Sequence, residues 1–174
     1  MKLLIVDDYL TNRQLLRLTL EAEGFQIWEA SDGVESLAIL ERQKIDAVIA
    51  DILMPNMDGY RLCQELRQRD KLYALPVLLY TGTYTAEEDR ELGLNMGADA
   101  YLAKPASKEA LLAALNEAIQ KAKGRTTAAS AGNGDPSHVM RQYNQTLIRK
   151  LEKKNLQLEE ALVALTRAYE MSTL

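Results

Sequence analysis

The chain has 174 residues, of which 47% are hydrophobic and 26% are charged, so it can bury one domain core and carry an appended segment. No apolar run approaches the roughly 18 residues that a membrane span requires, and the first residues do not form the apolar stretch of a signal peptide. The single cysteine, Cys63, excludes an internal disulfide and is compatible with a reducing cytoplasm, where we expect the protein to reside.

The net charge of −4 is unevenly distributed along the chain. Residues 1–124 hold 14 Lys or Arg against 20 Asp or Glu, whereas residues 125–174 hold 7 against 5. Neither part has the basic stripe that nucleic-acid binding needs. We therefore expect no direct contact with nucleic acid, and the lack of a long apolar run predicts no association with a membrane.

Short apolar segments recur along the N-terminal part, and several are continuous rather than alternating, as in strands covered on both faces. Amphipathic helical patterns separate these segments, and one more follows the last. This alternation predicts a parallel sheet with helices on both faces. An α/β, flavodoxin-like, doubly wound fold with the strand order 2-1-3-4-5 fits about 120 residues of this pattern. The predicted strands are Lys2–Val6, Phe25–Ala30, Ile45–Ala50, Leu75–Tyr80 and Ala100–Ala103.

The composition changes after Lys123. Residues 124–137 read GRTTAASAGNGDPS, a small and polar stretch that is typical of a flexible linker. From His138 to about Tyr169, Pro and Gly do not occur and apolar residues return at helical spacing. The predicted organisation is a domain over residues 1–121, a linker over 122–137 and a helical stalk over 138–174.

Polar side chains follow four of the predicted strands. Asp7 and Asp8 follow the first strand, Asp51 the third, Thr81 the fourth and Lys104 the fifth. Because the carboxyl ends of parallel strands share one edge of a sheet, these groups should converge there. The crowded carboxylates would repel one another unless a hard cation such as Mg²⁺ were bound. Each feature alone is more often turn chemistry, a helix cap or a solvated lysine, but together they predict a site that forms an acyl phosphate.

The sequence resembles the receiver domains of response regulators in two-component signalling over residues 1–121. The resemblance rests on LLIVDD at 3–8, DILMPNMDG at 51–59, the Thr-Gly pair at 81–82 and YLAKP at 101–105. It implies that Asp51 is the phosphoacceptor, and that a histidine kinase or a phosphotransfer protein donates the phosphoryl group. The chain would then not be an enzyme with a separate substrate, because it would catalyse only its own phosphorylation and dephosphorylation.

The resemblance also implies how a metal would be held. Asp8 and Asp51 would bind Mg²⁺ directly, and the backbone carbonyl of Leu53 would supply a third protein oxygen. Asp7 would act mainly through metal-bound water.

Further roles in the resemblance fall on the last two strands. Thr81 and Lys104 would contact the phosphoryl group, and the peptide bond between Lys104 and Pro105 would be cis. Phosphorylation would draw the Thr81 hydroxyl inward, and Tyr101 would move into the vacated space. The simpler interpretation is that Tyr101 is an amphipathic strand residue with an exposed tip.

Other classes of protein fit the pattern less well. A phosphatase of the haloacid dehalogenase type would carry its nucleophile after the first strand in a D-x-D pattern, whereas Asp7 and Asp8 are adjacent. A flavin-binding flavodoxin would need a phosphate loop rich in Ser, Thr and Gly where the chain reads DDYLTNRQ. A pseudo-receiver that is never phosphorylated is disfavoured because every required side chain is present. The chain could also be the N-terminal receiver of a hybrid histidine kinase or of another multidomain signalling protein.

A heptad pattern runs through residues 148–169 of the predicted stalk and indicates a C-terminal α-helical coiled-coil extension, whereas the apolar residues before residue 148 keep helical spacing in another register. Lys154 at position g can reach Glu159 at position e of a parallel partner, and an isolated Asn at position a favours two parallel strands in register. We therefore expect a parallel homodimer through residues 138–170, with signalling through the conformation or dimerisation of this helix. The alternative is a helix that packs on its own receiver domain. The core positions are Ile148, Asn155, Leu162 and Tyr169 at a, and Leu151, Leu158 and Leu165 at d.

Overall fold

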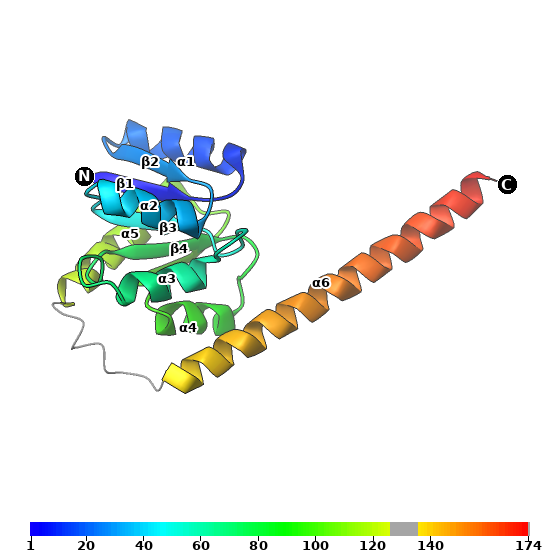
Figure 1. The fold of residues 1–174 in the computed structure, drawn as a ribbon. Coiled ribbons are helices and arrows are strands. Elements are labelled where there is room, and N and C mark those ends of the chain that lie inside the picture. The colour runs from blue at the N-terminus through cyan, green and yellow to red at the C-terminus, as the bar shows by residue number, and fades with distance from the viewer. Residues whose placement is uncertain (126–135, 174) are drawn as a thin grey trace. The chain divides into compact units, whose positions relative to one another are not determined.

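The computed structural model describes residues 1–125 and 136–173. The chain divides into two compact units, Met1–Asn133 and Gly134–Leu174 (Figure 1). Within the part of the chain that the structure describes, none of the helices combines the length and the apolar character that crossing a membrane requires.

The first unit contains a sheet of five parallel strands in the order β2-β1-β3-β4-β5, as predicted from the sequence. Val6 at the end of β1 pairs with Ala30 of β2 and with Ala50 of β3, so the carboxyl ends of these strands lie at the same edge. Thr81 of β4 likewise pairs with Ala103 of β5. The strands are β1 (Lys2–Val6), β2 (Gln26–Ala30), β3 (Ala47–Ala50), β4 (Val77–Thr81) and β5 (Ala100–Ala103).

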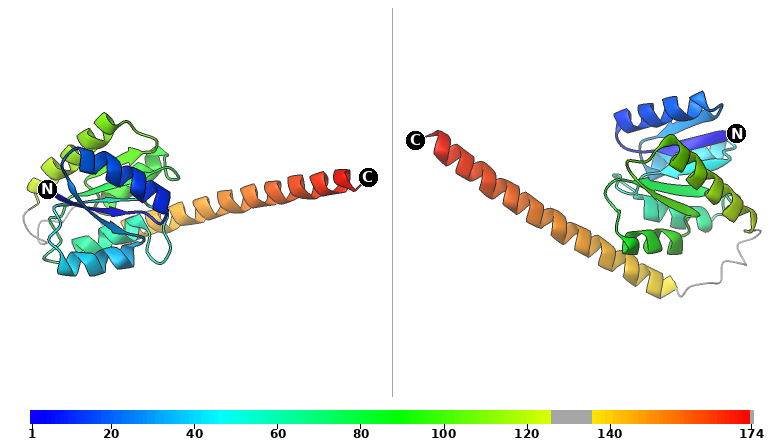
Figure 2. Two further views of the ribbon diagram at one scale, coloured as in Figure 1. Left: turned by 90° about the horizontal axis from the view of Figure 1, so that it is seen from above. Right: turned by 180° about the vertical axis from the view of Figure 1, so that it is seen from behind.

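Helices cover both faces of the sheet, with α1 and α5 on one face and α2, α3 and α4 on the other (Figure 2). Beneath α1 and α5, side chains such as Leu20 and Leu115 pack on Leu3, Ile49 and Leu78 of the strands. Coverage on both faces explains why the strand sequences are continuously apolar. The helices are α1 (Leu10–Ala22), α2 (Gly33–Arg42), α3 (Gly59–Arg67), α4 (Glu87–Asn95) and α5 (Lys108–Lys123).

The observed strands β3 and β4 begin later than predicted. Ile45 and Leu75 are buried, but they precede the strands rather than belonging to them. Pro76 has no N–H to donate to a neighbouring strand, and β4 accordingly begins at Val77. The predicted segments were therefore too long at their amino ends, because they were drawn from apolar runs and an apolar residue can be buried without belonging to a strand.

Side chains cap three of the helices that begin at the carboxyl edge of the sheet. Asp32, Asp58 and Ser107 each accept a hydrogen bond from the backbone N–H three residues further on, at the starts of α2, α3 and α5. Such caps satisfy N–H groups that have no partner within the helix. They also fix the loops that surround this edge of the sheet.

The second unit contains the helix α6, which spans Pro136–Ser172 and is about 55 Å long at about 1.5 Å per residue. It begins at Pro136 rather than at His138, and α5 continues to Lys123, beyond the predicted end of the domain at 121. Residues 126–135 of the predicted linker lie outside the described residues.

Candidate functional site

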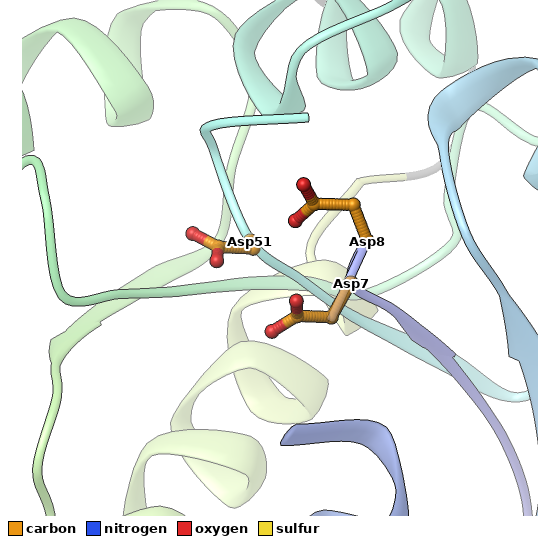
Figure 3. A group of neighbouring side chains, drawn as sticks. All are labelled: Asp7, Asp8 and Asp51. Carbon is orange, nitrogen blue, oxygen red and sulfur yellow. The ribbon is translucent and has the colours of Figure 1, made fainter. Parts of the chain in front are cut away.

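The aspartates Asp7, Asp8 and Asp51 meet at the carboxyl edge of the sheet (Figure 3). Asp7 and Asp8 follow β1, and Asp51 follows β3. Each offers a carboxylate oxygen, and these oxygens lie within 4.8 Å of one another. Asp7 and Asp51 are buried, whereas Asp8 is exposed, so the cluster is open to solvent on the side of Asp8.

Neighbouring groups hold the carboxylate of Asp7. Its Oδ1 accepts a hydrogen bond from the backbone N–H of Tyr9 at 2.9 Å, and its Oδ2 accepts one from the amide of Asn12 at 3.3 Å. The guanidinium of Arg13 donates to the backbone carbonyl of Asp7 at 2.6 Å. Sequence reasoning missed Asn12 and Arg13, because the pattern of α1 does not indicate which of its polar residues face the site.

The ammonium group of Lys104 contacts two of the carboxylates. Its Nζ lies 2.9 Å from Asp7 Oδ2 and 3.3 Å from Asp51 Oδ2. The Lys104 backbone N–H donates to the carbonyl of Thr81 at 2.8 Å, and the bond to Pro105 is cis, the isomer that the resemblance implies. Burial lowers the pKa of Lys104, but the hydrogen bond to Asp7 and the charges of Asp51 and Asp7 outweigh it, so the pKa is raised overall. Lys104 is therefore positively charged at neutral pH.

Crowding of the carboxylates has an electrostatic cost. Although the Asp8 side chain is exposed, partial loss of solvent around its carboxylate and the charges of Asp7 and Asp51 raise its pKa above the ordinary value of 3.8, against the opposing effect of a backbone hydrogen bond. A hard divalent cation relieves this repulsion, and clustered carboxylate oxygens are the donors that Mg²⁺ prefers. The residues present thus fit the implied metal.

The glycine of the Asp58-Gly59 pair is needed where the loop after β3 returns to α3. A Cβ at Gly59 would lie 2.4 Å from the backbone oxygen of Asp51, and the Gly59 N–H donates to the carbonyl of Ile52 at 2.9 Å. The Ile52 N–H in turn donates to Asp51 Oδ1 at 2.7 Å. Only a residue without a side chain allows this approach, so the loop is closed tightly around Asp51.

Thr81 and Tyr101 lie on neighbouring strands. Thr81 is fully buried, and its Oγ1 accepts a hydrogen bond from the N–H of Thr83 at 3.3 Å. The Tyr101 hydroxyl donates to the backbone carbonyl of Tyr84, and a Cβ added at Gly93 of α4 would lie 3.0 Å from the Tyr101 ring. The tip of Tyr101 is thus hydrogen-bonded to the loop after β4, and the residue as a whole is partly buried. Burial raises the pKa of this phenol.

The fold and the site together define a class of protein: doubly wound α/β domains with an acidic pocket and a lysine at the carboxyl edge of the sheet. The family model of the response regulator receiver domain matches residues 3–116. The chain belongs to this family, as its motifs predicted, and it carries the receiver domain of two-component signalling.

Relatives of this chain occur in proteins of different kinds. Probable transcriptional regulator ycf27 of Cyanophora paradoxa is 34% identical over 134 residues, which cover 77% of this chain and 54% of that protein. Sensor histidine kinase RcsC of Salmonella typhi is 42% identical over 126 residues, which cover 71% of this chain and 13% of that protein. The chain thus spans about half of the first relative and far less of the second.

Solved structures resemble the same part of the chain. Chemotaxis response regulator CheY4 of Vibrio cholerae is 35% identical with a TM-score of 0.62, covering 67% of this chain and 97% of that one. A putative response regulator of Chloroflexus aurantiacus is 34% identical with a TM-score of 0.65, covering 68% of this chain and 97% of that one.

Proposed function

We propose that this receiver is a cytoplasmic phosphoacceptor that is phosphorylated on Asp51 with Mg²⁺ as its cofactor. The observation that carries the proposal is the position of Lys104, whose ammonium contacts both Asp7 and Asp51. A cation at this point can pair with phosphoryl oxygens once Asp51 has reacted. The chemistry of the domain is then limited to its own phosphorylation and dephosphorylation.

The donor in this proposal is the phosphohistidine of a histidine kinase or of a phosphotransfer protein. A carboxylate oxygen of Asp51 forms a bond to phosphorus, the bond from phosphorus to the imidazole nitrogen breaks, and that nitrogen takes up a proton. Mg²⁺ held by Asp8, Asp51 and the Leu53 carbonyl would neutralise charge on the transferred group. Lys104 and the Thr81 hydroxyl hold the product as partners of its oxygens.

A groove beside the site supports docking of this donor. It has a volume of about 360 Å³, lies between α1 and α5, and is lined by Asp7 and Lys104 together with Leu15. Leu10, Leu15 and Leu18 of α1 are each more than half exposed, so an apolar surface continues from the groove. Leu15→Lys should slow transfer from a phosphorylated kinase but not from acetyl phosphate, which needs no docking surface. Equal slowing with both donors would contradict this role.

In this proposal, phosphorylation changes the positions of Thr81 and Tyr101, and this change then alters α6. Phosphoryl oxygens draw the Thr81 hydroxyl inward, and the bond between Tyr101 and the Tyr84 carbonyl gives the ring a direct connection to the loop after β4. The receiving element is the helix α6, as a parallel coiled-coil homodimer. Phosphorylation then changes the conformation or the dimerisation of α6.

The homodimer is supported by features of α6 itself. Its apolar heptad positions, such as Ile148 and Leu165, are each more than half exposed. Lys154 and Glu159 stand at positions where a second copy in parallel would pair them, and the Asn155 side chains would meet in that register. These features favour a second copy of the same chain as the partner that covers the apolar heptad positions of α6.

A second candidate is a receiver within a longer hybrid kinase. The similarity to RcsC, at 42% identity over 126 residues, favours this assignment for the native protein. The phosphoacceptor chemistry is the same in both cases, and they differ in the protein that the receiver serves.

Labelling with acetyl phosphate and Mg²⁺ tests the phosphoacceptor. Intact mass should increase by one phosphoryl group, and hydroxylamine should remove it because an acyl phosphate is labile to that nucleophile. Asp51→Asn should abolish the label. Asp70→Asn, an exposed position in the loop before β4, is the matched control and should label as the unaltered chain does. Full labelling of Asp51→Asn would overturn the assignment.

A further inference from the structure

The loop between β3 and α3 contains a residue with an unusual backbone. Asn56 has a φ of 67°, and among the described residues it is the one non-glycine position with positive φ. Asn tolerates this left-handed region better than most residues with a Cβ. Its side-chain Nδ2 donates to Oδ2 of Asp32 at 2.7 Å, across 24 positions of the sequence. The turn therefore aims the amide away from its own loop.

Asp32, which accepts the hydrogen bond of this amide, is itself held in place at the start of α2. Its other oxygen, Oδ1, accepts from the N–H of Glu35 at 2.8 Å and so caps the first turn of α2. The hydrogen bonds from Glu35 and then Asn56 lower the pKa of Asp32, so its carboxylate is charged at neutral pH. One carboxylate thus joins the start of α2 to the loop that follows Asp51.

A second contact lies next to the first. Gly33, the residue after Asp32, is covered by Met57, and a Cβ at Gly33 would lie 2.9 Å from three atoms of the Met57 side chain. The loop is therefore held on α2 by a polar contact and an adjacent apolar one. Its own ends are closed by the bond from the Gly59 N–H to the Ile52 carbonyl at 2.9 Å. In the sequence, Leu53 lies between Ile52, which accepts this bond, and Asn56 and Met57, which contact the start of α2.

We propose that Asn56 is a positioning residue for the metal site, because its bond to Asp32 holds the loop in the form that offers the Leu53 carbonyl to the cation. This inference rests on the Mg²⁺ binding proposed above. Asn56 is not one of the groups proposed above to bind the metal or the phosphoryl group. Its effect should therefore appear in the affinity for Mg²⁺ rather than in the identity of the phosphoacceptor.

Titration calorimetry of Mg²⁺ into the full chain tests the role of the amide. Asn56→Gly keeps the left-handed turn accessible and removes only the bond to Asp32. The dissociation constant for Mg²⁺ should rise about 3-fold to 10-fold, the range that corresponds to the loss of one ordinary protein hydrogen bond. Asn116→Gly, at an exposed position of α5, weakens a helix away from the loop and should leave the constant unchanged.

A charge exchange makes the test sharper. Asn56→Asp alone places two carboxylates face to face, whereas Asn56→Asp combined with Asp32→Asn restores an amide-to-carboxylate bond and keeps a capping residue on α2. The double variant should bind Mg²⁺ more tightly than Asn56→Asp. Charge alone predicts the opposite order, because the double variant has one negative charge fewer near the cation.

The outcomes separate the two proposals. Wild-type affinity in Asn56→Gly, or a double variant that binds no better than Asn56→Asp, would overturn the positioning role while leaving Mg²⁺ binding intact. Lower stability of Asn56→Gly in urea without Mg²⁺, at an unchanged dissociation constant, would also overturn it, since that marks a purely structural bond. Absence of Mg²⁺ binding in the unaltered chain would instead overturn the proposed metal site and this inference with it.

Discussion

The guanidinium of Arg125 pairs with the carboxylate of Asp99, although Arg125 lies beyond the end of α5 and Asp99 lies just before β5. Asp99 is fully buried, and its Oδ2 accepts from Arg67 at 3.0 Å and from the N–H of Val77 at 2.9 Å. One carboxylate thus joins α3, the starts of β4 and β5, and the chain that leaves α5. This cluster lies at the amino edge of the sheet, opposite the aspartate site.

Removing one arginine should destabilise the receiver, because a buried carboxylate is then left with less compensation. Arg125→Met should lower the free energy of unfolding by about 1–3 kcal/mol. Arg67→Met should cost about 3–5 kcal/mol, because Arg67 also donates to the carbonyls of Gly97, Tyr73 and Leu75. Urea unfolding measures both values. Arg61→Met at an exposed position of α3 is the control, and equal stability of all variants would contradict the assignment.

The same cluster shows what the sequence could not provide. Residues 67, 99 and 125 are far apart in the chain, and no periodicity or motif connects them. The change of composition after Lys123 predicted the start of a linker, but it gave no sign that Arg125 pairs with Asp99. The bond between Asn56 and Asp32 was invisible for the same reason, since it depends on how two loops meet.

The strands and the acidic site were predictable because their signals are local. Continuous apolar runs mark strands that are covered on both faces, and parallel pairing then brings the residues after each strand to one edge. Asp7 and Asp51 follow Val6 and Ala50, which are partners in the register of β1 and β3. Sequence order and sheet topology together therefore place these carboxylates, without any knowledge of the loops.

Replacing Asp8 should stabilise the protein when no metal is bound. The pKa of Asp8 is higher in the folded chain than the value of 3.8 that holds in the unfolded chain. Just above pH 3.8 the folded chain therefore keeps a proton that the unfolded chain has already lost. The free energy of unfolding consequently falls as the pH rises from 3.8 through the raised pKa. Asp8→Asn should remove this loss in EDTA and gain less than about 1 kcal/mol at neutral pH, since solvent screens an exposed charge. Urea unfolding between about pH 4 and about pH 7 measures the effect.

With Mg²⁺ bound, the unaltered chain should become more stable than Asp8→Asn, the reverse of the order expected in EDTA. The cation raises the melting temperature of the unaltered chain by mass action, and Asp8→Asn should lose most of that gain because a ligand is missing. Asp70→Asn should keep the full gain. An undiminished shift in Asp8→Asn would place the bound cation elsewhere.

Tyr101→Phe should uncouple the loop after β4 from the ring without affecting the chemistry. The ring can still pack beside Gly93, but the bond to the Tyr84 carbonyl is lost, which should cost about 0.5–1.5 kcal/mol of stability. Labelling by acetyl phosphate should stay at the rate of the unaltered chain. Amide chemical shifts of residues 82–86 should respond less to phosphorylation than in the unaltered chain. An identical response would remove Tyr101 from the proposed switch.

Light scattering should show that the full chain is a dimer. Leu158→Lys places a charge in the seam at position d and should give monomers, whereas Glu160→Lys at position f lies outside the seam and should leave the dimer intact. Asn155→Leu should raise the melting point of the stalk while admitting trimers or shifted registers, since the polar residue that selects two parallel strands is gone. A monomeric unaltered chain at micromolar concentration would contradict the homodimer.

The direction of the two helices can be tested with one introduced cysteine. In a parallel pair, residue 169 at position a faces residue 169 of the second copy, so Tyr169→Cys should form an intermolecular disulfide under mild oxidation. Arg167→Cys at position f points away from the seam and should remain reduced. The native Cys63 should not interfere, because it is buried and burial raises the pKa of its thiol to about 12, which leaves almost no reactive thiolate. In an antiparallel pair, residue 169 would face the opposite end of the partner helix, so a chain that stays dimeric without this crosslink would refute the parallel arrangement.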